Sequence, residues 1–249
     1  MILLNTIKEL NPEIAELIGA HIGDGSMELY KGRYVVSFFG HPIEDENYVK
    51  RIAEIYSKYF GVSPRIRKWS GVIGFQICSK DIFDFISSLG IPSGKKDGVD
   101  IPELIKLSDK EIVSSCIRGI FDTDGTMYFE FKNRKYYPRI QLKITSEKVA
   151  KSVNILLNER FDIKSTLYFR KESPNRKMSY FVEIRGVEKL ERWMEEIGFN
   201  NIKHLSKVEL WKDNINPRQQ FDIRIKLLKG PVAQHGRAAH KTAEAFNLL

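Results

Sequence analysis

The sequence predicts an α+β protein, in the broad sense an α/β fold, made of two tandem copies of one αββαββα unit. Two observations support this prediction. The stretch LIGAHIGDGS at residues 17–26 returns as IRGIFDTDGT at residues 117–126, and each is an apolar helical run that ends in Asp-Gly. The same order of hairpin, helix, second pair of strands and helix follows each stretch. A period this long in two copies indicates a duplicated domain, not a solenoid.

The first copy begins with a helix. Asn11 is a favourable N-cap residue, and Pro12 suits the first helical position. A hairpin follows, MELYKGRYVVSFF, with its turn at Lys31-Gly32. The helix ENYVKRIAEIYSKYF, the strands SPRIRKW and GVIGFQICS, and the helix DIFDFISSLGI complete the unit. We assign residues 1–107 to this copy.

The second copy begins with SDKE at residues 108–111, which matches a capping box with Ser108 as the cap. Its hairpin, MYFEFKNRKYYPRIQLKI, turns at Asn133-Arg134. The helix SEKVAKSVNILLNERF, the strands KSTLYFR and MSYFVEIR, and the helix VEKLERWMEEIGF follow. We assign residues 108–228 to this copy, and we expect residues 229–249 to form a mobile, dispensable tail.

Composition limits the classes of function. The chain has 249 residues, 42% of them hydrophobic, which is enough for a packed core. A net charge of +8 favours nucleic acid as partner over an anionic membrane, since no basic amphipathic helix stands out. Without a signal peptide or an apolar run of membrane-spanning length, we expect a soluble, cytoplasmic protein. Cys78 and Cys116 have no metal-ligand spacing, and we expect both in the core.

The predicted strands carry basic and polar side chains on one face. In YYPRIQLKI, for example, Arg139 and Gln141 alternate with Ile140 and Leu142. Such side chains contact base edges and phosphates. Any antiparallel sheet with one hydrated face is polar there, but the same bias in both copies of a basic chain favours a nucleic-acid surface. The candidate contact residues are Arg33, Ser37, Arg65, Arg67, Gln76, Tyr137, Arg139, Gln141, Lys143, Tyr168, Arg170 and Arg185.

Asp24 and Asp124 end the two repeated helices. The helix macrodipole is negative at that end and disfavours an added anion by about 0.3–1 kcal/mol, whereas a bound divalent cation would reverse the sign. Asp-Gly is also a common turn dipeptide, yet its position before a hairpin in both copies favours a function. Gly19 and Gly119 would allow close approach of the helices, which would bring the aspartates together across a pseudo-two-fold axis.

LIGAHIGDG and IRGIFDTDG resemble the two signature helices of the LAGLIDADG homing endonucleases, in their single-chain, two-repeat form. The second helix has both acidic positions of that motif, Asp122 and Asp124. In the first helix, Ile22 replaces the earlier acidic residue, and His21 stands where an apolar residue is usual. The resemblance covers residues 12–212. It implies paired central helices and two antiparallel four-stranded sheets that together form a DNA-binding saddle.

The same resemblance implies a monomeric endonuclease that cuts both strands of a long, asymmetric DNA target across the minor groove and leaves short 3′ overhangs. Asp24 and Asp124 would bind two or three Mg²⁺ ions, helped by backbone oxygens of Gly23 and Thr123. Mg²⁺ prefers such oxygen ligands; Mn²⁺ or Ca²⁺ would substitute, Ca²⁺ without cleavage. Candidates to position water and screen phosphate charge are Lys96 or its neighbour Lys95, Lys203, Gln76 and Lys143, each also explicable as an ordinary surface residue.

Other classes stay open at this point. A catalytically silent DNA-binding regulator or an RNA maturase would share the scaffold, and a structural basic domain would not need two aspartates. An intein would need a nucleophilic first residue and a His-Asn end, whereas this sequence starts with Met1 and stops at Leu249, so we expect no intein. Retention of Asp24 and Asp124 argues against lost catalysis, but RNA as an additional partner remains compatible with the sequence.

Overall fold

The computed structural model describes residues 10–96, 98–133 and 135–212. The first copy contains α1 (Pro12–Gly23), β1 (Gly25–Tyr30), β2 (Arg33–Gly40), α2 (Glu46–Phe60), β3 (Arg67–Trp69), β4 (Val72–Cys78) and α3 (Lys80–Ser88). After the short helix α4 (Glu103–Lys106), the second copy contains α5 (Lys110–Asp124), β5 (Gly125–Lys132), β6 (Lys135–Ile144), α6 (Glu147–Arg160), β7 (Ser165–Lys171), β8 (Met178–Arg185), α7 (Val187–Glu196) and α8 (Ile202–Lys212). The predicted αββαββα order is confirmed in both copies. The expected tail lies outside the described residues.

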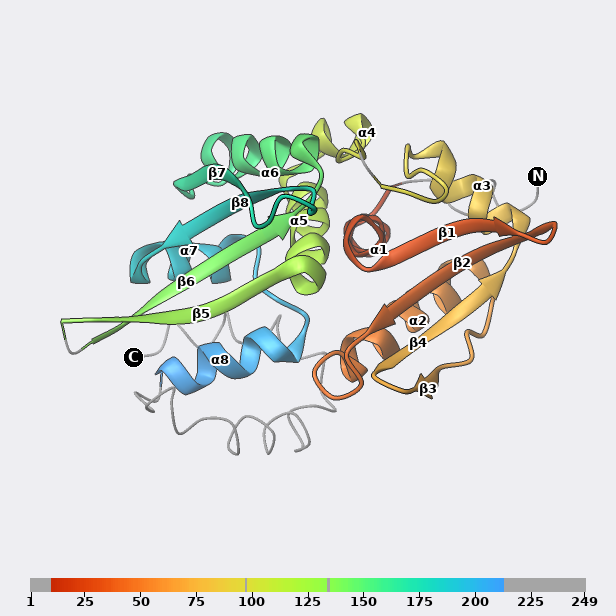
Figure 1. Cartoon of the computed structure of the whole chain (residues 1–249), viewed down its shortest axis with the longest axis horizontal. Coiled ribbons are helices and arrows are strands. Elements are labelled where there is room, and N and C mark those ends of the chain that lie inside the picture. The colour runs from red at the N-terminus through yellow and green to blue at the C-terminus, as the bar shows by residue number, and fades with distance from the viewer. Residues whose placement is uncertain (1–9, 97, 134, 213–249) are drawn as a thin grey trace.

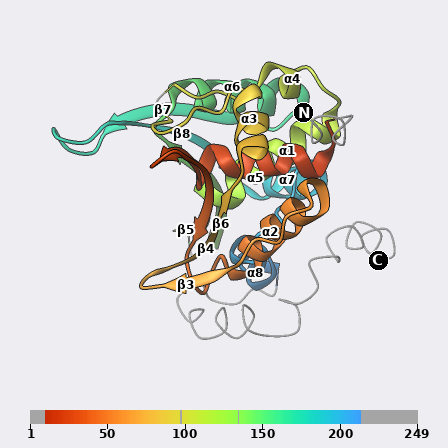
Figure 2. The same cartoon turned by 90° about the vertical axis from the view of Figure 1, so that its right-hand side faces the viewer.

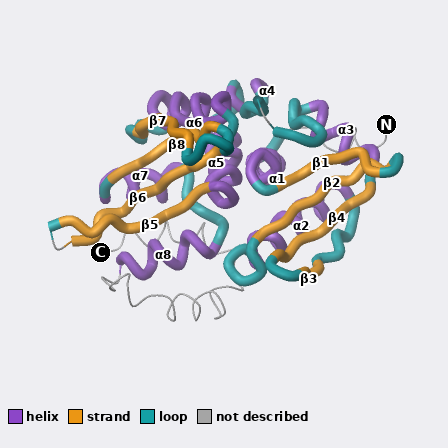
Figure 3. The backbone as a smooth tube through the Cα atoms, viewed as in Figure 1, coloured by secondary structure: helices purple, strands orange, loops and turns teal. Residues whose placement is uncertain are grey.

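Each copy forms one antiparallel sheet of four strands. The strand orders are β1-β2-β4-β3 and β5-β6-β8-β7, so both sheets have the same topology. Helices α2 and α3 contact the first sheet, and α6 and α7 contact the second. Figure 1 shows α1 and α5 between the two sheets, and Figure 3 shows that the strands of both sheets run in similar directions around this pair. In the view turned by 90° about the vertical axis, the strands lie to the left of α1, α2 and α5 (Figure 2).

The two copies meet where α1 packs against α5. A Cβ atom on Gly19 would overlap the Cys116 carbonyl oxygen, and one on Gly119 would overlap the Glu16 carbonyl oxygen. The contacts are reciprocal, because Cys116 precedes Gly119 by the same three positions that separate Glu16 from Gly19. Reciprocal contacts of equivalent residues are the property of a two-fold interface. The predicted pairing of the helices about a pseudo-two-fold axis is confirmed.

Helix α1 is enclosed by the rest of the fold, since every residue from Ile14 to Ile22 is buried. Its one buried carboxylate, Glu16, accepts hydrogen bonds of 2.7 Å from both Nε and Nη2 of Arg51. Burial alone would raise the pKa of Glu16, but the Arg51 guanidinium holds it below its ordinary value. His21 contacts the Tyr56 hydroxyl, and burial lowers its pKa to about 3, so this imidazole is neutral.

Local signals at the helix starts were only partly correct. Asn11 caps α1 as predicted, because its side chain accepts 3.1 Å hydrogen bonds from the backbone N–H groups of Glu13 and Ile14. The predicted capping box of α5 is wrong, since Asp109 is the N-cap residue and makes no side-chain cap hydrogen bond. The Ser108 hydroxyl instead donates to the Leu104 carbonyl at 2.6 Å. This acceptor belongs to the short helix α4, which the pattern did not reveal.

Two further expectations need correction. The segment SPRIRKW forms a strand only over Arg67–Trp69, so Arg65 precedes β3. Cys116 is buried as predicted, but Cys78 is exposed, because β4 ends there and the alternation turns this side chain away from the core. Among the helices of the described residues, none has the length and apolarity needed to cross a membrane.

We expect Gly119→Ala to lower the free energy of unfolding by about 1–3 kcal/mol, because the new methyl group must displace backbone atoms of α1. Urea denaturation measures this change. Glu111→Ala, at an exposed position of the same helix, is the control and is expected to change stability by less than about 0.5 kcal/mol. A Gly119→Ala protein as stable as the wild type would contradict the close packing of the helices.

Candidate functional site

Asp24 and Asp124 lie at the adjoining C-terminal ends of α1 and α5. Asp24 is the C-cap of α1, Asp124 is the last residue of α5, and both side chains are half-buried. The ends are close, since a Cβ atom on Gly23 would overlap the Thr123 hydroxyl and stand 3.4 Å from the Asp124 carboxylate carbon. Glycine at position 23 is therefore what allows the second aspartate to come this near. The predicted meeting of the two acidic helix ends is present in the fold.

The environment of these aspartates disfavours their charged form. Burial raises the pKa of Asp124 to about 7, and the Asp24 carboxylate adds to this rise, while Lys96 and Lys203 oppose it. Burial also raises the pKa of Asp24, with a further contribution from Asp45, against Lys203 and Lys96. Two acids that repel each other at negative helix ends leave an excess of negative charge that a cation would stabilise.

Two lysine side chains close the same helix ends. The Lys96 ammonium donates to the carbonyl oxygens of His21 at 3.1 Å and of Gly25 at 2.8 Å, and also to those of Ile22 and Gly23. The carbonyls of His21, Ile22 and Gly23 belong to the last turn of α1, where backbone carbonyls have no partner within the helix, and Gly25 begins β1. Lys95 is exposed, so of the two neighbouring candidates Lys96 is the one brought to the aspartates. Burial lowers the pKa of Lys96, and the charges of Asp124 and Asp24 counteract this effect.

In the second copy, the ammonium of Lys203 donates to the Thr123 carbonyl at 3.1 Å. The carbonyl oxygens of Gly23 and Thr123, expected as metal ligands, thus each accept a hydrogen bond from a lysine. The carbonyl oxygens of Met27 and Met127 also accept hydrogen bonds, but from different donors: Met27 accepts from the Gly94 backbone N–H at 2.7 Å, and Met127 accepts from Lys207 Nζ at 2.8 Å. In both copies, therefore, a lysine donates to a carbonyl at the end of the paired helix.

The donor atoms at the site fit a hard divalent cation. Over residues 10–96, 98–133 and 135–212, no group of three or more His, Cys, Asp or Glu side chains is arranged to hold a metal. A cation here would therefore depend on the two carboxylates of Asp24 and Asp124 together with backbone oxygens, water or a phosphate. Mg²⁺ is commonly bound through one or two carboxylates and keeps several waters. Zinc sites in proteins usually have three or four His, Cys, Asp or Glu ligands, and the described residues offer no such group here.

Most predicted DNA-contacting residues lie on the sheet face opposite the helices. Alternation places Gln141 opposite the buried pair Ile140 and Leu142, and the same holds for Gln76 between Phe75 and Ile77. The exposed members are Arg33, Arg65, Arg67, Gln76, Lys143, Arg170 and Arg185, and the half-buried members are Tyr137, Arg139, Gln141 and Tyr168. Ser37 lies on this face as well but is only 2% exposed, so its hydroxyl is not available to a large ligand.

A buried carboxylate organises the polar face of the second sheet. Glu183 is 3% exposed and accepts hydrogen bonds from the Tyr128 hydroxyl at 3.0 Å and from Arg185 Nε at 2.7 Å. Arg139 lies 3.9 Å from the same carboxylate and also pairs with Glu130. Guanidinium groups held in this way keep one orientation and lose little side-chain freedom when they bind a ligand.

The remaining strand candidates are also held by neighbours. Gln141 Nε2 donates to the Tyr168 hydroxyl at 3.0 Å, and the Tyr168 ring stacks on Phe181 with a centroid distance of 4.9 Å. Lys143 pairs with Glu172 at 2.6 Å. Lys143, a candidate to assist catalysis, is thus directed toward a carboxylate at the end of β7 in this structure. Gln76, the other strand candidate for catalysis, is exposed and lies on β4 directly opposite Ser37 of β2.

Sequence reasoning missed a polar network beside the aspartates. The Asp45 carboxylate lies 3.0 Å from Lys203 Nζ and accepts a hydrogen bond of 2.7 Å from Asn201. The carboxylate of Asp122, the earlier acidic position of the motif, is fully buried and accepts from the Asn200 backbone N–H at 2.8 Å. Burial raises the pKa of Asp122 to about 7. The only sequence signal was that Asp45 precedes a helix, which suggests a cap and not a contact with a residue far along the chain.

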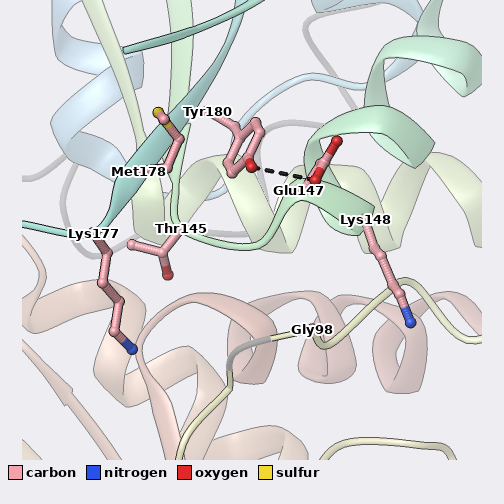
Figure 4. A pocket seen from close by; sticks show the side chains of 7 residues that line it. All are labelled: Gly98, Thr145, Glu147, Lys148, Lys177, Met178 and Tyr180. Carbon is pink, nitrogen blue, oxygen red and sulfur yellow. Dashed lines mark hydrogen bonds between the residues drawn. The ribbon is translucent and has the colours of Figure 1, made fainter. Parts of the chain in front are cut away.

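A surface pocket with a volume of about 310 Å³ lies apart from this set of residues. Its lining residues come from the linker at Gly98, the start of α6 and the start of β8, with the Tyr180 hydroxyl donating to Glu147 at 3.2 Å (Figure 4). None of the candidate site residues lines it, so it takes no part in the chemistry of the paired helix ends.

Comparison with known proteins agrees with this fold. Residues 111–198 match the family described as LAGLIDADG-like domain. The crystal structure of I-DmoI in complex with DNA and Mn aligns with a TM-score of 0.55 and 16% identity over 76% of this chain and 98% of that one. The homing endonuclease I-WcaI bound to its DNA recognition sequence aligns with a TM-score of 0.52 and 14% identity over 88% and 89%. At this identity, the likeness establishes a shared fold.

Curated relatives match this chain over a small part of their own length. A replication factor C small subunit of Methanocaldococcus jannaschii is 31% identical over 213 residues, which are 84% of this chain and 11% of that protein. A replicative DNA helicase DnaB of Rhodothermus marinus is 26% identical over 198 residues, 73% of this chain and 20% of that protein. The chain therefore spans at most a fifth of the length of either relative.

We expect Asp124→Asn to stabilise the protein at pH 8 by up to about 4 kcal/mol, with a difference that shrinks toward zero near pH 4. The native carboxyl titrates near pH 7 and the unfolded one near pH 4, so the native state binds more protons in this window and loses stability as the pH rises. Asparagine cannot lose this proton. Urea denaturation in EDTA at both pH values measures the effect.

Asp81→Asn, at an exposed position of α3, controls for the loss of a negative charge in general and is expected to give no gain at pH 8. A difference between Asp124→Asn and the wild type that is the same at pH 4 and pH 8 would show that the buried charge is not its cause.

Proposed function

We propose that this chain is a site-specific DNA endonuclease of the LAGLIDADG homing endonuclease family, since residues 111–198 match the LAGLIDADG-like domain. It would hydrolyse one phosphodiester bond in each strand of a long, asymmetric duplex target, across the minor groove, and leave short 3′ overhangs. The observation that carries this proposal is the meeting of Asp24 and Asp124 at the paired ends of α1 and α5. One carboxylate from each copy matches one scissile phosphate on each strand.

The similar solved structures support DNA as the partner, and the curated relatives support a segment that moves between genes. I-DmoI and I-WcaI are described in complex with DNA, the former with Mn or Ca. The two curated relatives have different names and share with this chain a segment of about 200 residues that fills a small part of each. A segment that occurs in proteins of different function is independent of those functions, which is the distribution that homing of a mobile element produces.

Asp24 and Asp124, with the backbone oxygens of Gly23 and Thr123, would hold two or three Mg²⁺ ions. When bound, Mg²⁺ supplies a Lewis acid and an acidified water for attack on phosphorus. The half-buried setting of the aspartates excludes bulk water and strengthens their interaction with cations. Lys96 and Lys203 place positive charge beside the same helix ends, and we assign to them the screening of the negative phosphate and the orientation of water.

The polar faces of the two sheets would bind the duplex. Arg67 and Arg170 are exposed and available to phosphates, whereas Arg139, Gln141 and Arg185 are held by neighbouring side chains in orientations suited to base edges. The two faces carry different residues, so the target would be asymmetric. We propose residues 1–107 and 108–228 as the two halves. Because one chain supplies both halves, we propose that it acts as a monomer.

Asp24→Asn and Asp124→Asn are each expected to abolish cleavage in Mg²⁺ while duplex binding survives. Each change removes one anionic cation ligand without altering side-chain shape. The assay uses a supercoiled plasmid that carries the cleavage site selected from a library of random duplex inserts. Ca²⁺ in place of Mg²⁺ should support binding by the wild type without cleavage.

Asp109→Asn, a change at the exposed start of α5, is the matched control and should cut like the wild type. Unimpaired cutting by either aspartate variant would refute the assigned roles. A wild type that binds duplex DNA with Mg²⁺ and cuts nothing would favour the silent regulator on the same scaffold, and binding to RNA in preference to DNA would favour a maturase.

Arg67→Ala and Arg170→Ala are each expected to weaken binding to duplexes of any sequence and to reduce the slope of log affinity against log salt by about 1. Both guanidinium groups are exposed on the polar face, where a phosphate contact releases a counterion. Fluorescence anisotropy at several salt concentrations measures the slope. Lys151→Ala on α6, on the helical side of the second sheet, should leave the slope unchanged; an equal loss there would mean that charge alone, and not this face, determines binding.

A further inference from the structure

Asp45 belongs to the first copy, but its side chain contacts the second. It is the N-cap residue of α2 and makes no side-chain cap hydrogen bond. Its carboxylate lies 3.0 Å from Lys203 Nζ and accepts a hydrogen bond of 2.7 Å from Asn201 Nδ2. The exposed fractions of the two charged side chains are 12% for Asp45 and 11% for Lys203. A largely buried ion pair thus joins the copies next to Asp24 and Asp124.

The surrounding loop fixes the orientation of this carboxylate. The other oxygen of Asp45 accepts a hydrogen bond of 2.8 Å from the His41 backbone N–H. A Cβ atom on Gly40 would stand 2.6 Å from the Asp45 Cβ, so only glycine leaves room for the turn. On the opposite side, Asn201 also donates to the Asp122 carbonyl at 2.9 Å, which ties this amide to the end of α5.

The second copy has no such acid at the equivalent place. Ser146 lies 101 positions after Asp45 and is the N-cap of α6, where its hydroxyl accepts from the Val149 backbone N–H at 3.4 Å. It also donates to the Val99 carbonyl, so it works as an ordinary uncharged cap. Lys96, the counterpart of Lys203, contacts carbonyl oxygens and forms no ion pair within the described part of the chain. The two lysines therefore differ in how they are held.

We propose that Asp45 is a positioning residue that fixes Lys203 beside Asp124 and makes the two halves of the site cut their strands at different rates. The proposal rests on the proposed endonuclease function. Lys203 is held by an ion pair with Asp45, and the negative charge of Asp45 offsets part of the attraction between Lys203 and a phosphate. Lys96 carries its full charge but is held only by neutral acceptors. An otherwise symmetric pair of helix ends thereby becomes two unequal half-sites.

The first test follows each strand separately. With the plasmid defined above and each strand end-labelled after linearisation, Asp45→Asn and Asp45→Ser are compared with the wild type. We expect cleavage of one strand to slow about tenfold, the size typical for loss of a group that orients a catalytic residue. The other strand should keep its rate, so duplexes cut in one strand accumulate, and duplex affinity should not change. Asp109→Asn, a second N-cap aspartate without a cap hydrogen bond, is the matched control.

A structural role alone would not produce this pattern, because partial unfolding slows both strands equally. Lys203→Gln should slow the same strand, and adding Asp45→Asn to it should have no further effect, since residues that act through one contact are not additive. Equal slowing of both strands, or a double variant whose losses add, would overturn the proposal.

The second test needs no cleavage. In free protein labelled with ¹⁵N-lysine, the Lys203 ammonium signal should be protected from hydrogen exchange in the wild type and lose that protection in Asp45→Asn, while the other lysine signals stay. Unchanged exchange at Lys203 would overturn the positioning role. If the wild type cuts no insert but Lys203 loses protection, the contact stands and the endonuclease function fails. The two failures are therefore distinguishable.

Discussion

The close packing of α1 against α5 is the contact on which the rest of this structure depends. Gly19 and Gly119 each lie against a backbone carbonyl of the opposite helix, so the two helices meet without intervening side chains. This contact fixes where the helices end relative to each other, and with them Asp24 and Asp124. It also places one sheet on either side of the helix pair (Figure 1), so that the polar faces of both sheets can share one ligand. A looser contact would separate the carboxylates and the sheets together.

The same contact creates an electrostatic problem that the fold solves in part. Two helix C-termini and two aspartates concentrate negative charge, and burial raises the pKa of both acids. Lys96 and Lys203 compensate by donating to the terminal carbonyls. The compensation is incomplete, since an acid with a pKa of about 7 gains from a cation that an ordinary surface aspartate would not need. A site that costs stability when empty of cations is poised to bind them.

How much of this could be predicted from the sequence depends on the range of the interaction. Periodicity and turn residues act over a few positions, so the two copies, their element order and the pairing of Gly19 with Gly119 were predictable. The catalytic candidates Asp24 and Asp124 were found because they recur. Features set by a distant partner were not predictable: Ser108 turns to a carbonyl of α4, and Asp45 meets Lys203. Ser37 lies on the polar face of its strand, as the alternation predicted, but it is buried, and alternation alone does not reveal burial by neighbouring residues.

The close packing of α1 against α5 explains why the two copies differ at Asp45 and Ser146 and not at the paired helices. Any side chain larger than hydrogen at Gly19 or Gly119 would collide with a backbone carbonyl, and because the contact is reciprocal, one change would disturb both copies. The start of α2 is under no such constraint, since a helix N-terminus accepts either Ser or Asp at the cap. Divergence between the copies is therefore least disruptive at a cap such as Asp45, which lies one contact away from the aspartates. A duplicated fold can in this way keep a symmetric centre and still treat two chemically different DNA strands unequally.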